Sequence, residues 1–159
     1  MSHDHVLISV IDAEPPGGEN VPARRLDDEK WEIIRSPLYA TEVASGDVIK
    51  VTNAETGGFE IIRRSGNICI QFYLCEDKGD DAQFTSDLAE DVGVLIEPLN
   101  GRIDAITAGL FSLTIPAVSG FQAIEKVFEM AVEKCPGSQW QYANVYDTVT
   151  GEPLGWWGE

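Results

Sequence analysis

The first half of the chain alternates short apolar runs with polar breaks, a pattern typical of strands separated by turns. Strands are expected at residues 6–11 and 31–35, and residues 23–26 are expected to pair with the second of these across a turn at 27–30. Residues 14–20 contain two prolines and two glycines, which predicts a loop. The pattern therefore indicates a β-rich unit at the N-terminal end.

A β-hairpin is predicted next, with arms at residues 47–52 and 59–64. Both arms are rich in β-branched residues, and the connection contains Gly57 and Gly58, which tolerate the positive φ that tight turns require. Residues 68–74 follow as a nearly continuous apolar run. Such a run predicts a strand that is buried on both faces.

The remaining chain alternates helix and strand patterns. After the strand at 68–74 we expect a helix at 80–91, which Gly93 ends, and then strands at 94–97 and 110–115. A second helix follows, with Ser119 as its N-cap and Pro136 as the residue that stops it, and the last expected element is a strand at 140–146. This order matches the split βαβ, or ferredoxin-like, arrangement of an antiparallel sheet with two helices on one face. The predicted fold class is α+β.

The 159 residues are the size of one domain. We expect a single compact domain that contains a β-rich subdomain at 1–66, a ferredoxin-like βαββαβ subdomain at 67–147 and a C-terminal tail at 148–159. Three cysteines, Cys69, Cys75 and Cys135, lack metal-type spacing and predict reduced, buried thiols. With no signal-peptide pattern and no apolar stretch long enough to span a bilayer, we expect a cytoplasmic protein.

Charge narrows the expected partners. The chain has 27 acidic against 11 basic residues and a net charge of -16, and residues 67–159 carry 15 of the acids but only 4 of the bases. Nucleic acids and anionic membranes are bound through clustered lysines and arginines, so neither is expected as a partner. An acidic surface instead favours fast capture of a basic protein.

Common catalytic and cofactor motifs are absent from the sequence. It has no phosphate-binding loop, dinucleotide fingerprint, nucleophile elbow, zinc-protease motif or C-x-x-C pair. Its two histidines, His3 and His5, lie near the N-terminus. We therefore expect no catalytic residue, no metal and no cofactor.

Two surfaces are candidates for binding a protein partner. The first is a run of carboxylates around the helix predicted at 80–91, which could also hold a calcium ion or simply face solvent: Asp77, Asp80, Asp81, Asp87, Glu90 and Asp91. The second is the pair Trp156 and Trp157, which either anchors a partner or packs back on the domain. For a small anionic ligand the candidates are Arg35, Arg63 and Arg64, which could instead pair with neighbouring carboxylates.

Two stretches, residues 31–51 and 59–72, resemble the bacterial proteins grouped as domain of unknown function 4265. The matching positions are Pro37, Leu38, Tyr39, Ala40, Gly46, Asp47 and Val48 in the first stretch, and Arg64, Ser65 and Gly66 in the second. Where members often continue with a polar His-Ser-Thr type of sequence, this chain has Asn67, Ile68 and Cys69. The resemblance covers about residues 31–146 and implies no particular activity.

Three functions stay open at this point. The first is an immunity protein whose acidic surface occludes the basic groove of a cognate toxin or effector. The second is a small-molecule-binding regulatory or sensor domain that uses the arginines. The third is an enzyme that uses paired carboxylates with Tyr39 or Tyr73.

Overall fold

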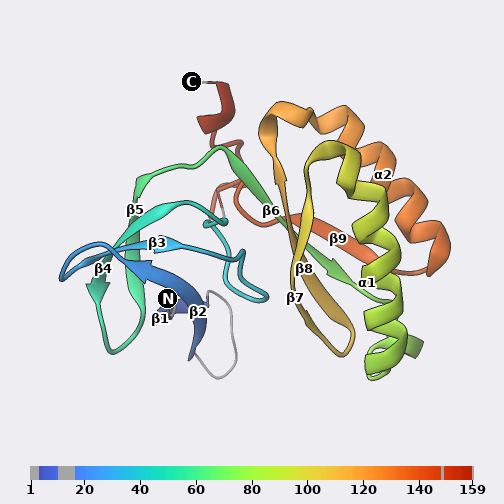
Figure 1. Ribbon diagram of the computed structural model, residues 1–159, viewed down its shortest axis with the longest axis horizontal. Helices are drawn as coiled ribbons and strands as arrows, with labels where there is room; N and C mark the ends of the chain where they lie inside the picture. The colour runs from blue at the N-terminus through green and yellow to red at the C-terminus, as the bar shows by residue number, and fades with distance from the viewer. Residues whose placement is uncertain (1–3, 11–16, 148, 159) are drawn as a thin grey trace.

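The computed structural model describes residues 4–10, 17–147 and 149–158. Its described part contains two antiparallel sheets and two α-helices (Figure 1), which confirms the predicted α+β class. The first sheet lies to one side of the second, and the helices lie on the opposite side of the second sheet.

The first sheet is an antiparallel meander in the order β1-β2-β3-β4-β5. Its strands are β1 (Asp4–Val10), β2 (Gly17–Arg25), β3 (Lys30–Ile33), β4 (Val48–Asn53) and β5 (Gly58–Arg63). The predicted pairing of 23–26 with 31–35 and the predicted hairpin are both confirmed. The amide of Ser9 donates to the carbonyl of Gly57 over 2.8 Å, so the sheet curls until β1 meets the β4–β5 turn.

The predicted loop at 14–20 is wrong in its second part. Gly17, Gly18, Glu19 and Asn20 belong to β2 and pair with Val10, Ser9, Ile8 and Leu7 of β1. Pairing with β1 along a full register stabilises an extended conformation that the glycines alone do not favour. Residues 11–16 lie outside the described residues.

The second sheet has the order β7-β8-β6-β9 with every neighbouring pair antiparallel. Its strands are β6 (Asn67–Tyr73), β7 (Arg102–Thr107), β8 (Leu110–Pro116) and β9 (Gln139–Tyr142). The helices α1 (Ala82–Ile96) and α2 (Phe121–Lys134) cover one face of this sheet (Figure 1). Among the described residues, no helix is long and apolar enough to cross a membrane.

Two predictions about the helices are wrong. α1 does not end at Gly93 but continues to Ile96, so the strand predicted at 94–97 does not exist, and β7 at Arg102–Thr107 takes its place in the sheet. Burial of Val92 and Ile96 in the core stabilises this last helical turn. Ser119 does not cap α2; its hydroxyl donates to the carbonyl of Leu99, and Gly120 is the N-cap.

The second sheet is buried on both faces, with a different chemistry on each. Toward the helices, β6 and β8 present large apolar side chains: Ile68, Ile70, Phe72, Phe111, Leu113 and Ile115. Toward the first sheet, the same strands present Gln71, Ser112 and Thr114, which are also buried. The period of two along each strand produces this division.

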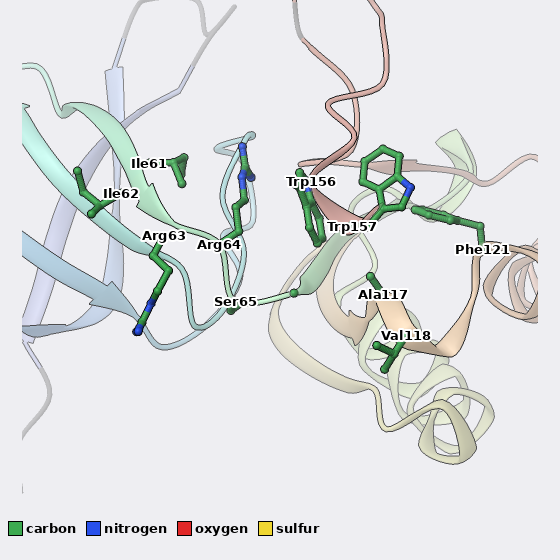
Figure 2. A pocket seen from close by; sticks show the side chains of 11 residues that line it. Ile61, Ile62, Arg63, Arg64, Ser65, Ala117, Val118, Phe121, Trp156 and Trp157 are labelled. Carbon is green, nitrogen blue, oxygen red and sulfur yellow. The ribbon is translucent and has the colours of Figure 1, made fainter. Parts of the chain in front are cut away.

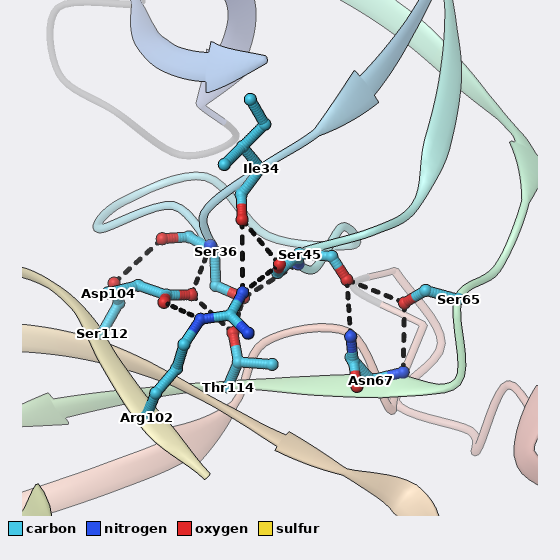
Figure 3. A network of polar contacts seen from close by, with 9 residues as sticks. All are labelled: Ile34, Ser36, Ser45, Ser65, Asn67, Arg102, Asp104, Ser112 and Thr114. Atoms are coloured by element: carbon cyan, nitrogen blue, oxygen red, sulfur yellow. Dashed lines mark hydrogen bonds and ion pairs between the residues drawn. The ribbon is translucent and has the colours of Figure 1, made fainter. Parts of the chain in front are cut away.

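A hydrogen-bonded network fills the space between the two sheets (Figure 3). The buried carboxylate of Asp104 accepts from the amide of Ser36 at 2.7 Å, from the hydroxyl of Thr114 at 2.5 Å and from Nε of Arg102 at 2.8 Å. Arg102 also donates to the carbonyl of Ile34 and to the hydroxyl of Ser45. A buried polar group without a hydrogen-bond partner destabilises the folded protein. The network therefore favours the one orientation of the two sheets in which all of these hydrogen bonds form.

Candidate functional site

A groove of about 840 Å³ opens where the two sheets meet. Three segments line it, and the lining residues, which we call the junction groove, are Ile61, Ile62, Arg63, Arg64, Ser65, Gly66, Ala117, Val118, Phe121, Trp156 and Trp157. The segments are the end of β5 with the turn after it, the start of α2 with the turn before it, and the C-terminal 3-10 turn η4 (Trp156–Gly158). Figure 2 shows the arginines on one side and the tryptophans on the other.

Three aromatic rings form one wall of the junction groove. The ring of Trp157 meets those of Trp156 and Phe121 edge to face, with centroid distances of 5.5 and 5.2 Å. The indole N–H of Trp156 donates to the carbonyl of Asn144 over 2.8 Å. These contacts hold the C-terminal segment on the second sheet, and both tryptophans remain partly exposed.

Arg64 is a fixed cation at the floor of the junction groove. Its guanidinium lies 5.7 Å from the centre of the Trp156 ring, donates to the carbonyl of Glu42 over 2.8 Å, and lies 3.8 Å from the carboxylate of Asp47. Burial lowers the pKa of Arg64, although the negative charges of Asp47 and Glu42 oppose that effect. Because the guanidinium stays protonated throughout the physiological range, it remains positively charged here.

Asp47 is the completely buried partner of Arg64. Its two oxygens accept from the amides of Ser65 at 2.8 Å and Ala44 at 3.0 Å. Burial raises the pKa of this carboxyl, and the hydrogen bonds from Ser65 and Ala44 act in the opposite direction. Among the positions that carry the family resemblance, Arg64, Ser65 and Gly66 therefore line the groove, and Asp47 supports Arg64 from behind the lining.

Arg63 is the available cation of the junction groove. Its side chain is exposed and, within the described part of the chain, makes no hydrogen bond or ion pair. In Figure 2 its guanidinium points away from the tryptophans. The lining residues contain two arginines but no aspartate or glutamate, although the chain as a whole has a net charge of -16.

The structure brings together only some of the residues proposed from sequence. Arg63, Arg64, Trp156 and Trp157 share the junction groove, whereas Arg35 is exposed and does not line it. Pro116 ends β8 just before Ala117 and Val118, and nothing local in the sequence indicates that this turn faces the tryptophans. Val118 is 94% exposed.

The six carboxylates, here called the acidic face, are all exposed: Asp77, Asp80, Asp81, Asp87, Glu90 and Asp91. The carboxylate of Asp81 caps α1 by accepting from the amide of Phe84, and Asp87 accepts from the side chain of Gln83. The acid-bearing start of α1 lies at the opposite end of the molecule from the C-terminal segment (Figure 1). Trp156 and Trp157 are therefore not part of the acidic face.

The described residues include no group of three or more histidine, cysteine, aspartate or glutamate side chains placed to hold a metal ion. His5 lies exposed on β1, and His3 is outside the described residues. Tyr39 is exposed, and burial raises the pKa of Tyr73. Neither tyrosine lines the junction groove.

A family model described as domain of unknown function (DUF4265) matches residues 19–137. No curated protein matches the chain. Among solved structures, the chain is similar to a hypothetical protein from Neisseria gonorrhoeae, with a TM-score of 0.66 and 17% sequence identity over 90% of this chain and 95% of that one. The two proteins share a fold.

Proposed function

The chain belongs to the DUF4265 family, as its sequence motifs predicted, and because that family has no described activity we propose a function from the junction groove itself. We propose that the protein is a small-molecule-binding regulatory or sensor domain. Its ligand is an organic anion with an apolar or aromatic body. The observation that carries this proposal is a groove with two arginines and no acidic lining residue in a strongly acidic chain.

The arginines account for the anionic group. Arg64 is held against Asp47 and Trp156, so part of its charge is already balanced. Arg63 has no described partner, and a guanidinium binds a carboxylate or phosphate oxygen pair in a bidentate manner. Arg63 is thus the expected contact to the anionic group of the ligand.

The aromatic wall of the junction groove is the reason why we expect the ligand to have an apolar or aromatic body. Trp157, Phe121 and the exposed Val118 provide apolar surface within the same groove. Ligand sites are typically clefts of roughly 300–1,000 Å³ with mostly apolar walls and a few polar groups that fix orientation. The volume of about 840 Å³ falls in this class.

The proposal is tested with pairs of probes that differ only in charge. Phenylacetate and decanoate are compared with phenylacetamide and decanamide for their effect on the melting temperature and for binding by calorimetry. A ligand that binds only the folded protein raises its melting temperature, and at one ligand concentration the tighter ligand raises it more. The anions should bind more tightly than the matched amides, and equal binding or no binding of all four probes would contradict the proposal.

Two arginine variants sharpen this test. Arg63→Gln removes the available cation and is expected to weaken binding of the anions by about tenfold or more, since charge-assisted hydrogen bonds contribute roughly 1.5–3 kcal/mol. Arg35→Gln is the matched control because Arg35 is exposed but does not line the groove. Its affinity should equal that of the wild type.

A second candidate function is the neutralisation of a basic protein partner, as in bacterial immunity proteins that occlude a toxin or effector. The supporting observation is that the six carboxylates of the acidic face are exposed and none of them takes part in an ion pair between described residues. An excess of negative charge over a helix and the turn before it steers basic proteins toward this surface and accelerates their association. The cytoplasm as the place of this encounter stays a prediction.

Charge reversal on α1 tests the second function. A variant with Asp87→Lys, Glu90→Lys and Asp91→Lys keeps the capping residue Asp81, and Glu129→Lys with Glu133→Lys on α2 is the control on another exposed helix surface. A basic partner co-purified from the native cell is then titrated with each purified variant at low and high salt. Loss of affinity in the first variant alone supports neutralisation through the acidic face, and unchanged affinity contradicts it.

We also interpret the second half of the chain, from β6 to β9, as a ferredoxin-like unit. The supporting observations are the element order β6, α1, β7, β8, α2, β9 and the strand order β7-β8-β6-β9 with all neighbours antiparallel. In this interpretation, the first sheet covers the face of the ferredoxin-like sheet that lies away from the helices.

A further inference from the structure

Two cysteines that are distant in sequence lie in direct contact away from the junction groove. The sulfur atoms of Cys75 and Cys135 are 3.2 Å apart, although 60 positions separate the two residues in the chain. Cys75 follows the end of β6, and Cys135 is the C-cap of α2. Cys135 is buried as the sequence predicted, but Cys75 is partly exposed, which corrects the expectation of three buried thiols.

Backbone hydrogen bonds fix both cysteines in this arrangement. The amide of Cys75 donates to the hydroxyl of Ser138 over 3.2 Å, and the amide of Ser138 donates to the carbonyl of Cys135. The amide of Lys78 donates to the carbonyl of Cys75. At Gly137, whose φ is +94°, an added Cβ would lie 3.2 Å from the Cβ of Cys75, so this glycine leaves the space that the contact needs.

We propose that Cys75 and Cys135 form a reversible intramolecular disulfide by thiol–disulfide exchange with a small disulfide such as oxidised glutathione. The two sulfurs already touch, and a modest approach of the side chains brings them to the bond length of about 2.05 Å. The disulfide would join the end of β6 to the end of α2. The site is a redox modification site and does not depend on the function proposed for the groove.

The exchange has two steps in which atoms and electrons balance. The thiolate of the partly exposed Cys75 attacks oxidised glutathione, forms a mixed disulfide and releases one glutathione thiolate. The thiolate of Cys135 then attacks the Cys75 sulfur of that mixed disulfide and releases the second glutathione. Two protein thiols are oxidised, one glutathione disulfide is reduced to two glutathione molecules, and the two thiol protons pass to the released thiolates.

The surroundings of Cys135 suit it to the second step. Burial acts to raise the pKa of its thiol, but hydrogen bonds from Ser138 and Cys75 and the charge of Lys78 hold that pKa below its usual value. The pKa of the Cys75 thiol is raised, chiefly by its hydrogen bond with Cys135. Cys75 is therefore the accessible thiol, and Cys135, which has the greater thiolate character, is the resolving thiol.

The third cysteine provides an internal control. Cys69 is completely buried in the interior, where its thiol lies 3.8 Å from the carbonyl of Pro37. Burial raises the pKa of this thiol, which disfavours the reactive thiolate. Cys69 should stay reduced under conditions that oxidise the other two.

The experiment equilibrates the folded wild-type protein with buffers of increasing oxidised-to-reduced glutathione ratio, quenches the exchange with acid, alkylates the free thiols in denaturant so that buried thiols also react, and measures the intact mass. The expected product has lost two hydrogens and carries one alkyl group, on Cys69. Trypsin places Cys69 and Cys75 in one peptide, residues 65–78, and Cys135 in another, residues 135–159. A Cys69→Ala variant therefore assigns the linked peptides to Cys75 and Cys135 without ambiguity.

Two further variants test the order of the steps. Cys135→Ser should accumulate a glutathione mixed disulfide on Cys75, whereas Cys75→Ser should react slowly because its remaining sulfur at this site is buried. Wild-type protein that keeps three alkylatable thiols at every ratio, or that stops at the mixed disulfide, overturns the proposal. This outcome is read on the unmodified chain, so it does not depend on whether the variants fold.

Discussion

The guanidinium of Arg64 lies 5.7 Å from the centre of the Trp156 ring, and this contact joins the end of the first sheet to the C-terminal segment of the chain. The carboxylate of Asp47 forms an ion pair with Arg64, and the carbonyl of Asn144 accepts a hydrogen bond from the indole N–H of Trp156. Both partners are therefore fixed before any ligand arrives. Preorganisation of this kind reduces the entropy that binding costs.

We predict a measurable coupling energy between Arg64 and Trp156. A double-mutant cycle with Arg64→Gln and Trp156→Leu, followed by urea unfolding, should give about 1 kcal/mol or more, because desolvation strengthens a cation–π contact. The matched cycle uses Arg25 and Trp31, whose guanidinium and ring are 5.8 Å apart but whose arginine side chain is 52% exposed. A coupling for Arg64 and Trp156 that is no larger than this control would argue against a structural role for the contact.

Glu19 is predicted to stabilise the loop that carries part of the family resemblance. Its carboxylate accepts from three consecutive backbone amides, those of Leu38, Tyr39 and Ala40, over 2.8 to 2.9 Å. Glu19→Gln turns one acceptor into a donor that faces an amide, so unfolding free energy in urea should fall by about 1–3 kcal/mol. Glu55→Gln, at an exposed position in the β4–β5 turn, should change it by less than about 0.5 kcal/mol.

Asp27 is predicted to give a pH-dependent stabilisation. Hydrogen bonds from the amides of Glu29 and Lys30 lower the pKa of this carboxyl below its ordinary 3.8. A lowered folded-state pKa contributes stability that is fully present above the unfolded-state value and is lost as the pH falls through the folded-state value. Asp27→Asn should therefore be less stable than the wild type at neutral pH, and this difference should shrink as the pH falls below 3.8.

Urea unfolding at neutral and acidic pH checks the Asp27 prediction. Asp28→Asn is the neighbouring control, because the Asp28 side chain is fully exposed and accepts no amide hydrogen bond between described residues. The prediction fails if the stability difference between Asp27→Asn and the wild type is the same at both pH values.

Gly109 is predicted to tolerate no side chain. It has a φ of +80°, and an added Cβ would lie 2.3 Å from the carbonyl oxygen of Gly79, where the β7–β8 turn packs on the chain before α1. Gly109→Ala combines backbone strain with a clash against backbone atoms, so we expect a loss of about 3 kcal/mol or more in thermal unfolding. Gly151→Ala, with a φ of +75° and open space around it, should cost only the strain of roughly 1–2 kcal/mol. Equal losses in the two variants would show that the packing against Gly79 is not the cause.

Local sequence was sufficient where neighbouring residues decide the structure. The β4–β5 hairpin, the buried β6 strand and the apolar side of α2 follow from β-branched runs, turn glycines and helical periodicity, which act over a few residues. The family, the α+β class and the acidic character of the α1 region could likewise be derived without coordinates.

Only the tertiary structure decided the rest, because those features depend on contacts between distant segments. α1 continues past Gly93 because Ile96, one helical turn further on, is buried in the core. β7 is held by its pairing with β8, and its Asp104 accepts from the amide of Ser36 across the interface between the two sheets. The sequence by itself determined that arginines and tryptophans were candidates for binding. Packing of the two sheets decided that Arg63, Arg64, Trp156 and Trp157 share one groove. Packing of α2 on the second sheet decided that Cys75 meets Cys135, because long-range burial outweighs the weak preferences of short segments.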